Sequence, residues 1–244
     1  MMSWFRFSPN KFDLIAISVL YVAVVGAYRV AFQVFTAERP IALFIVFAVV
    51  GLLLLGVLAP VLYTTLIKKQ NLDSIGVGKR WWKTSLILGL ILGGIQYAFT
   101  LAGFPLPEPA KWGPLLVMAL TVGLFEALFF RGFIQNRLEE SFGIVPSIIL
   151  AAGLYSVYHI GYMMGWGEML FLFWLGIGFA VVFRLTRNIL ILWPFIIPVG
   201  SFFNNLRAGD IELPMISMLG FGEVLAAICV LLFIIYKRQQ KRTT

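Results

Sequence analysis

The chain has 244 residues, of which 61% are hydrophobic and only 12% are charged. A soluble domain keeps about a quarter of its residues charged, so this composition excludes an ordinary soluble protein and favours a polytopic membrane protein. The net charge of +8 does not indicate nucleic-acid binding, because the basic residues lie at the ends of apolar segments and not on one face of a folded module.

Apolar segments of about 20 residues, the length that crosses a bilayer, follow one another along the chain. We expect about eight transmembrane helices, at residues 12–35, 41–67, 84–103, 113–132, 144–163, 168–185, 189–206 and 213–236. The first segment is too long for the core of a signal peptide, so we expect it to be retained. The predicted fold class is an all-α, polytopic membrane helix bundle.

The distribution of lysine and arginine predicts the topology of the bundle. Most of these residues fall in alternate connecting segments, on the side that also carries both termini, so both termini are expected in the cytoplasm. Trp112 and Trp166 lie at span ends, as interfacial aromatic residues do. We therefore expect an integral, multi-pass protein of a prokaryotic cell membrane, surrounded by lipid.

Several polar side chains interrupt the apolar spans. A charged side chain at mid-bilayer costs several kcal/mol, so each one requires a partner or a function. Arg29 in the first span and Glu223 in the last span are isolated from the others, which suggests that each snorkels to the interface or forms a salt bridge. The candidates are Arg29, Glu126, Arg131, His159, Ser201, Asn204, Asn205 and Glu223.

Four of these residues are predicted to lie in one layer of the bundle. The fourth and fifth spans meet near residues 142–143, and Glu126 and His159 are each about 24 Å from this turn if the fourth helix continues to it. Residues equidistant from the turn of an antiparallel hairpin lie at the same depth. On the seventh span, counted from residue 188, Ser201 lies about 20 Å and Asn205 about 26 Å along the helix, close to the depth of the other two. Because they are four residues apart, they share one helix face.

Arg131 and Asn204 are predicted to support this layer without forming its centre. Arg131 is five residues after Glu126, about 140° around an α-helix, and so it is poorly placed to pair with that carboxylate. We expect it to contact a neighbouring helix or the cytoplasmic side. A buried polar network that only fixes helix packing is an equal alternative for the whole cluster.

The residue types in the layer limit its chemistry. Catalytic zinc takes three protein ligands, but the layer offers one histidine and one carboxylate, so we expect no metal and no other cofactor. A nucleophilic Ser201 would need a base and a suitable turn, and the sequence shows no such turn. The remaining chemistry is hydrolysis of an amide by water that Glu126 and His159 activate, with Asn205 donating to the oxyanion.

The same residues resemble the motifs of the CPBP (CAAX protease and bacteriocin-processing, Abi) family of intramembrane endopeptidases. The family motif EExxxR corresponds to "EALFFR", which begins at Glu126. An aromatic or apolar stretch that ends in histidine corresponds to "YSVYH", which ends at His159, and HxxxN corresponds to "SFFNN", from Ser201 to Asn205. The first and third motifs are degenerate, because Ala127 and Ser201 stand where the family has glutamate and histidine.

The resemblance covers about residues 70–206. It divides the chain into N-terminal transmembrane helices (1–69), a CPBP-like core (70–206), and a last transmembrane helix with a basic cytoplasmic tail (207–244). It implies that Glu126 and His159 activate water and that Asn205, with the residue at position 201, stabilises the oxyanion. It also implies a peptide or a prenylated or otherwise lipidated protein as the substrate.

Three functions stay open at this point. The first is an active intramembrane endopeptidase of the type II CAAX prenyl endopeptidase kind. The second is a catalytically inactive family member that binds and regulates another membrane protein. The third is a proton-coupled transporter with a Glu–His relay, which is less favoured because the sequence shows no internal repeat.

Overall fold

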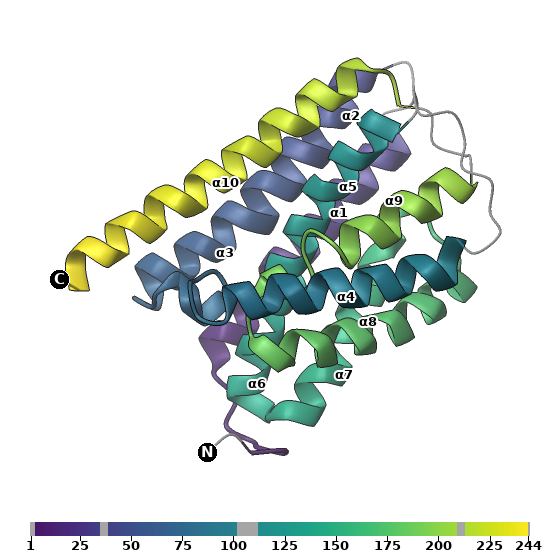
Figure 1. The fold of residues 1–244 in the computed structure, drawn as a ribbon. Helices are drawn as coiled ribbons and strands as arrows, with labels where there is room; N and C mark the ends of the chain where they lie inside the picture. Colours follow the sequence, from purple (N-terminus) through teal and green to yellow (C-terminus); the bar gives the residue numbers. More distant parts are fainter. Residues whose placement is uncertain (1–2, 35–38, 102–111, 209–212, 244) are drawn as a thin grey trace.

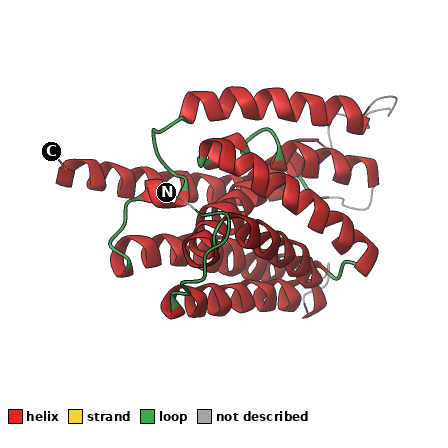
Figure 2. Cartoon of the chain, turned by 90° about the horizontal axis from the view of Figure 1, so that it is seen from below, coloured by secondary structure: helices red, strands yellow, loops and turns green. Residues whose placement is uncertain are grey.

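The computed structural model describes residues 3–34, 39–101, 112–208 and 213–243 (Figure 1). Every regular element in these ranges is a helix, and the described residues form no strand (Figure 2). The helices pack side by side into one bundle (Figure 1). The predicted all-α, polytopic bundle is therefore confirmed.

Six described helices are long and apolar enough to cross a membrane. Three of them are α1 (Lys11–Val34), α8 (Trp166–Thr186) and α10 (Ile216–Thr243). The second span is continuous from Pro40 to Ile67 and consists of α2 (Pro40–Phe44), the π-helix η1 (Ile45–Leu58), α3 (Ala59–Leu62) and the π-helix η2 (Tyr63–Ile67).

The other two spans form a hairpin. The first of these consists of α5 (Trp112–Glu126), the π-helix η5 (Ala127–Gln135) and α6 (Asn136–Phe142). The second consists of α7 (Ile144–Val157) and the 3₁₀-helix η6 (Tyr158–Tyr162). The expected fourth span therefore continues well beyond residue 132, to the turn at residues 142–143, and this continuity is the condition on which the predicted layer depends.

The segment expected as the seventh span is not one helix. It consists of the 3₁₀-helix η7 (Ile189–Ile191), a turn, and α9 (Ile197–Ala208). Pro194 lies in the break, because proline has no N–H to donate and its ring clashes with the preceding turn. Pro198 is tolerated because it lies in the first turn of α9. The expectation of a continuous helix over 189–206 is therefore wrong.

The segment expected at 84–103 forms α4 (Trp82–Leu101), which has 20 residues. It is not among the six helices that meet the length and hydropathy criteria for a span. A short 3₁₀-helix, η3 (Leu72–Ile75), precedes it. Figure 1 shows α4 lying next to α9, and the two helices are in contact.

The hairpin turn is held by the N-terminal segment. Gly143 has φ +86°, a left-handed conformation that glycine adopts without strain. The backbone N–H of Arg6 donates to the carbonyl of Phe142 at 2.9 Å, and that of Ile144 donates to the carbonyl of Ser3 at 3.2 Å. A Cβ at position 143 would lie 2.9 Å from the nitrogen of Arg6, so the close approach of the two segments also requires glycine.

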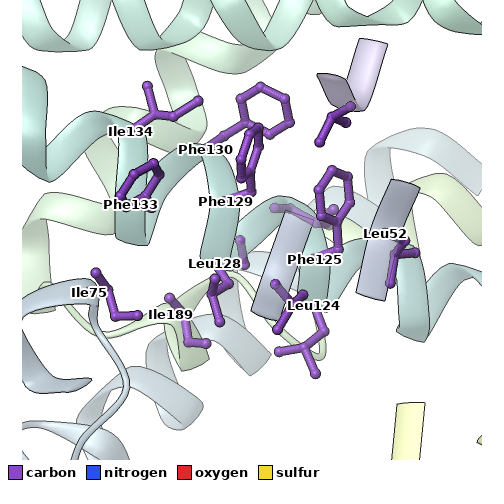
Figure 3. Close-up of a cluster of buried hydrophobic side chains, with 14 of the residues drawn as sticks. Leu52, Ile75, Leu124, Phe125, Leu128, Phe129, Phe130, Phe133, Ile134 and Ile189 are labelled. Atoms are coloured by element: carbon purple, nitrogen blue, oxygen red, sulfur yellow. The ribbon is translucent and has the colours of Figure 1, made fainter. Parts of the chain in front are cut away.

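The centre of the bundle is aromatic and apolar. The middle of the long helix faces η1 on one side and η3 and η7 on the other, and its side chains are fully buried (Figure 3). The residues labelled in this cluster are Leu52, Ile75, Leu124, Phe125, Leu128, Phe129, Phe130, Phe133, Ile134 and Ile189.

Two glycines allow the helices that carry the candidate site to approach closely. A Cβ at Gly123 of α5 would lie 2.6 Å from Cγ of Pro198 in α9. A Cβ at Gly161 of η6 would lie 2.8 Å from Cβ of Tyr28 in α1. A distance below 3 Å is too short for any real side chain, so α9 and α1 reach these positions because position 123 and position 161 carry none.

Candidate active site

A cavity of about 660 Å³ lies among α1, the second span, α5, η6, α9 and α10. Glu126, His159, Ser201 and Asn205 all line it. The structure therefore brings together the four residues that the sequence predicted for one layer. Most of the remaining lining is apolar or aromatic: Phe32, Pro40, Leu43, Phe44, Phe47, Met118, Val122, Tyr158, Tyr162, Met164, Leu213, Pro214, Ser217 and Phe221.

Glu126 is the last residue of α5 and is 6% exposed. Tyr158 donates its hydroxyl hydrogen bond to Oε1 of Glu126, and Tyr155 donates to Oε2 at 3.3 Å. An ionised carboxylate has about four acceptor positions, so two hydroxyls leave room for further donors. The carboxylate is thus oriented by neutral groups and keeps acceptor capacity at a cavity wall.

The ring of His159 has a defined orientation. Its Nδ1 lies 2.9 Å from the carbonyl oxygen of Tyr155. A carbonyl only accepts, so Nδ1 carries the hydrogen, and in the neutral imidazole Nε2 is then the acceptor. The ring also packs against Tyr158, with 4.1 Å between centroids, and against Tyr162 at 5.6 Å. Backbone and aromatic contacts together hold the imidazole in one tautomer at the cavity, with Nε2 as the acceptor.

Arg131 is 1% exposed and does not line the cavity. Its Cζ lies 5.2 Å from the ring centroid of Tyr155, and its Nη1 and Nη2 have no hydrogen-bond partner among the described residues. The guanidinium therefore contacts the neighbouring helix α7. Both Arg131 and Glu126 contact Tyr155. In a π-helix, hydrogen bonds join residues five apart, so two residues with this spacing lie closer to one helix face than they would in an α-helix.

The third motif presents only one of its two asparagines to the cavity. Ser201 and Asn205 line it from one face of α9, as their spacing of four residues predicts. Asn204 is exposed and does not line it. The structure therefore does not bring Asn204 to the site, where the sequence had placed it as a supporting residue.

The tyrosines of the second motif were not predicted as site residues. Tyr155 and Tyr158 hold Glu126, and Tyr162 packs on His159. Their spacing of three and four residues in "YSVYHIGY" places them on the face that carries the site, and this periodicity was a readable signal. Among the described residues, no group of three or more His, Cys, Asp or Glu side chains is arranged to hold a metal ion.

Comparison with known proteins gives one match. Residues 108–197 match the family model described as Type II CAAX prenyl endopeptidase Rce1-like. This segment includes Glu126, Arg131 and His159 and ends before Ser201 and Asn205. No curated protein and no solved structure matches the chain significantly. Residues 108–197 are thus similar to the Rce1-like family, which agrees with the resemblance that the motifs of the sequence indicate.

Proposed function

We propose that this protein is a membrane endopeptidase that hydrolyses a peptide bond in a prenylated or otherwise lipidated substrate. The observation that supports it is the lining of one largely apolar cavity by Glu126, His159, Ser201 and Asn205. An apolar cavity with a few convergent polar groups is the usual form of a small-molecule or peptide site. The Rce1-like match supports the same reaction class and the same kind of substrate.

Water is the nucleophile in this proposal. Glu126 and Nε2 of His159 accept hydrogen bonds from one water molecule, and one of them takes its proton as the oxygen attacks the scissile carbonyl carbon. The carbonyl oxygen becomes an oxyanion, which the side-chain amide of Asn205 stabilises by donating a hydrogen bond. When the C–N bond breaks, the same proton is delivered to the leaving amine, so the products are an amine and a carboxylic acid, which then ionises to the carboxylate.

The residues around the base have defined tasks in this scheme. The two tyrosine hydroxyls fix the carboxylate without neutralising it, because they are uncharged donors. Ser201 lies one helical turn before Asn205 and offers a second, shorter donor to the oxyanion. Arg131 acts through Tyr155, which it contacts, and is therefore a positioning residue.

The test is cleavage of prenylated and unprenylated peptides by the purified protein in lipid nanodiscs. Glu126→Gln and His159→Ala should each lower the cleavage rate by about 10²–10⁴-fold, the usual contribution of a general acid–base group. Glu223→Gln is the matched control, because Glu223 is an exposed glutamate in α10 that does not line the cavity. Equal rates for wild type and both site variants would reject the proposal.

The degenerate third motif favours a second candidate, an inactive family member that binds a membrane protein. Serine is shorter than histidine, so the hydroxyl of Ser201 reaches less far into the cavity than the family residue would. Under this candidate the wild type is inert, and the same partner co-purifies with wild type, Glu126→Gln and His159→Ala. Ser201→His separates the two: activity that appears only in this variant would identify a site that has lost its oxyanion donor.

A further inference from the structure

A second cavity, of about 400 Å³, lies away from the candidate active site. Its walls come from the segment before α4, from α4 itself, from the loop that contains η7, and from the C-terminal half of α10. Leu124 forms part of the wall, and because it is two residues before Glu126 it faces the opposite side of α5. We call this cavity the α4–α10 groove.

The side chains of Asn188 and Trp193, two polar groups that line the α4–α10 groove, already have partners. The side chain of Asn188 donates to the carbonyls of Gly78 and Arg80, at 2.9 and 3.1 Å, and accepts from the N–H of Leu190 at 3.0 Å. Nε1 of Trp193 donates to the backbone outside the groove, at the carbonyl of residue 120, at 2.9 Å. A polar ligand would find no unpaired donor or acceptor among these groups, so the interior suits an apolar chain.

The rim of the groove is basic. Lys79 lines it directly. Nζ of Lys83 lies 5.6 Å from the ring of Trp82, and Nζ of Lys237 lies 5.6 Å from the ring of Phe233, both of which are wall residues. An acidic group near this rim is Asp73, which interacts electrostatically with the wall residue Tyr236, and the three lysines outnumber it. Positive charge therefore exceeds negative charge at the rim.

An apolar interior beneath a basic rim matches one kind of molecule in a bilayer. An anionic phospholipid has an acyl chain for the walls and a net negative headgroup for the lysines. The distribution of lysine and arginine predicts that this end of the bundle is cytoplasmic, and anionic lipids concentrate in that leaflet. A zwitterionic lipid has the same chains but no net charge, so the rim distinguishes the two.

We propose that the α4–α10 groove binds an anionic phospholipid, with an acyl chain between α4 and α10 and the headgroup at Lys79, Lys83 and Lys237. Each lysine near an anionic headgroup contributes about 1 kcal/mol, or about five-fold in affinity. The binding does not depend on catalysis. An experiment can therefore reject lipid binding without rejecting the endopeptidase proposal, and the reverse.

The chain has a built-in reporter for this site. Cys229 is the only cysteine in the sequence, is exposed, and lines the groove. The experiment measures the rate at which a small maleimide labels Cys229 in delipidated protein in detergent, as phosphatidylglycerol or phosphatidylcholine with the same acyl chains is added. Native mass spectrometry of the same samples counts the bound lipids.

Phosphatidylglycerol should slow the labelling at a mole fraction at least about ten-fold lower than phosphatidylcholine. In the double variant Lys79→Gln and Lys237→Gln, half-protection should need about 20-fold more phosphatidylglycerol. The control is the double variant Lys11→Gln and Lys69→Gln, because it also removes two positive charges and neither residue lines the groove. Equal protection by the two lipids, or an unchanged response in the double variant, would overturn the proposal.

Discussion

The long helix from Trp112 to Phe142 carries two buried glutamates in contrasting surroundings. Glu126 accepts from two tyrosine hydroxyls and lines a cavity of about 660 Å³. Glu139, thirteen residues later, forms ion pairs with Arg184 and Arg187 and lines none of the cavities described above. Burial alone does not separate the two, because they are 6% and 5% exposed.

The difference lies in what balances each charge. Two guanidinium groups compensate Glu139, and they join α6 to the end of α8. Such a group holds helices together, and although Oε2 of Glu139 has no hydrogen-bond partner among the described residues, it lines neither cavity and so does not face a substrate there. The hydrogen-bond partners of Glu126 are uncharged, the nearby Arg131 acts on it through its charge, and the carboxylate keeps acceptor capacity at a cavity. A buried carboxylate held only by neutral donors beside a cavity is thus the better candidate for chemistry.

The largest expected effect separates these two glutamates. Glu126→Gln should lower the cleavage rate by about 10²–10⁴-fold and leave the melting temperature nearly unchanged, because an amide fits the same volume and still accepts from a hydroxyl. Glu139→Gln should change cleavage by only a few-fold. It should lower the unfolding free energy by about 1–3 kcal/mol. Removing one partner of a fully buried ion pair costs about 3–5 kcal/mol, and the cost is smaller here because both arginines are partly exposed to solvent.

Peptide cleavage and thermal unfolding followed by tryptophan fluorescence, on the same preparations, check both parts. The comparison fails if Glu139→Gln impairs cleavage as strongly as Glu126→Gln. It also fails if Glu126→Gln is the more destabilising of the two, because Glu126 would then be the structural residue.

A second comparison of neighbours lies on α9. Asn205→Ala should lower the cleavage rate by about 10²–10³-fold, the usual cost of one oxyanion donor, with KM nearly unchanged. Asn204→Ala removes the same amide from the exposed face of the same helix, so it should leave the rate within two-fold of wild type. Steady-state kinetics of both variants are the measurement. Similar losses in both would show that α9 contributes stability and not a donor.

The positions of site residues could be predicted from the sequence where they follow from the regular geometry of a helix. The common depth of Glu126 and His159 follows from the constant rise of a helix, so it needed only the continuation of the long helix to Phe142. The place of Ser201 at the cavity was predicted for a partly wrong reason, because the assumed helix from residue 189 is interrupted. Close packing at Gly123 brings α9 to the site instead.

Other features depend on tertiary contacts that no sequence pattern specifies. The π-helical winding of η5 changes the angle around the helix axis between Glu126 and Arg131. The number of residues between them does not show whether the helix is α or π. The contact of Arg131 with the face of Tyr155 depends on the relative position of two helices. The cytoplasmic location of the termini rests on charge distribution and stays a prediction.

A smaller effect tests whether the hydroxyl groups orient Glu126. Tyr158→Phe removes one donor and keeps the ring that packs on His159. Losing one hydrogen bond to a charged, buried group costs about 1–3 kcal/mol, so we expect a drop of about 10-fold in kcat. Tyr162→Phe is the control, because Tyr162 packs on the same histidine without a hydrogen bond to Glu126 among those described. Pre-steady-state cleavage rates of the two variants measure the difference.

The smallest effect concerns the spacing between the two helices of the site. Gly123→Ala places a methyl group 2.6 Å from Cγ of Pro198, so α9 must move away from α5. Overpacking of this kind costs about 1–3 kcal/mol, and the shift of Asn205 should lower cleavage several-fold. Gly153→Ala in α7 has open space around its new methyl group, and the higher helix propensity of alanine should leave stability equal or higher. If Gly123→Ala loses stability but cleaves at the wild-type rate, the asparagine on α9 does not contact the reacting group.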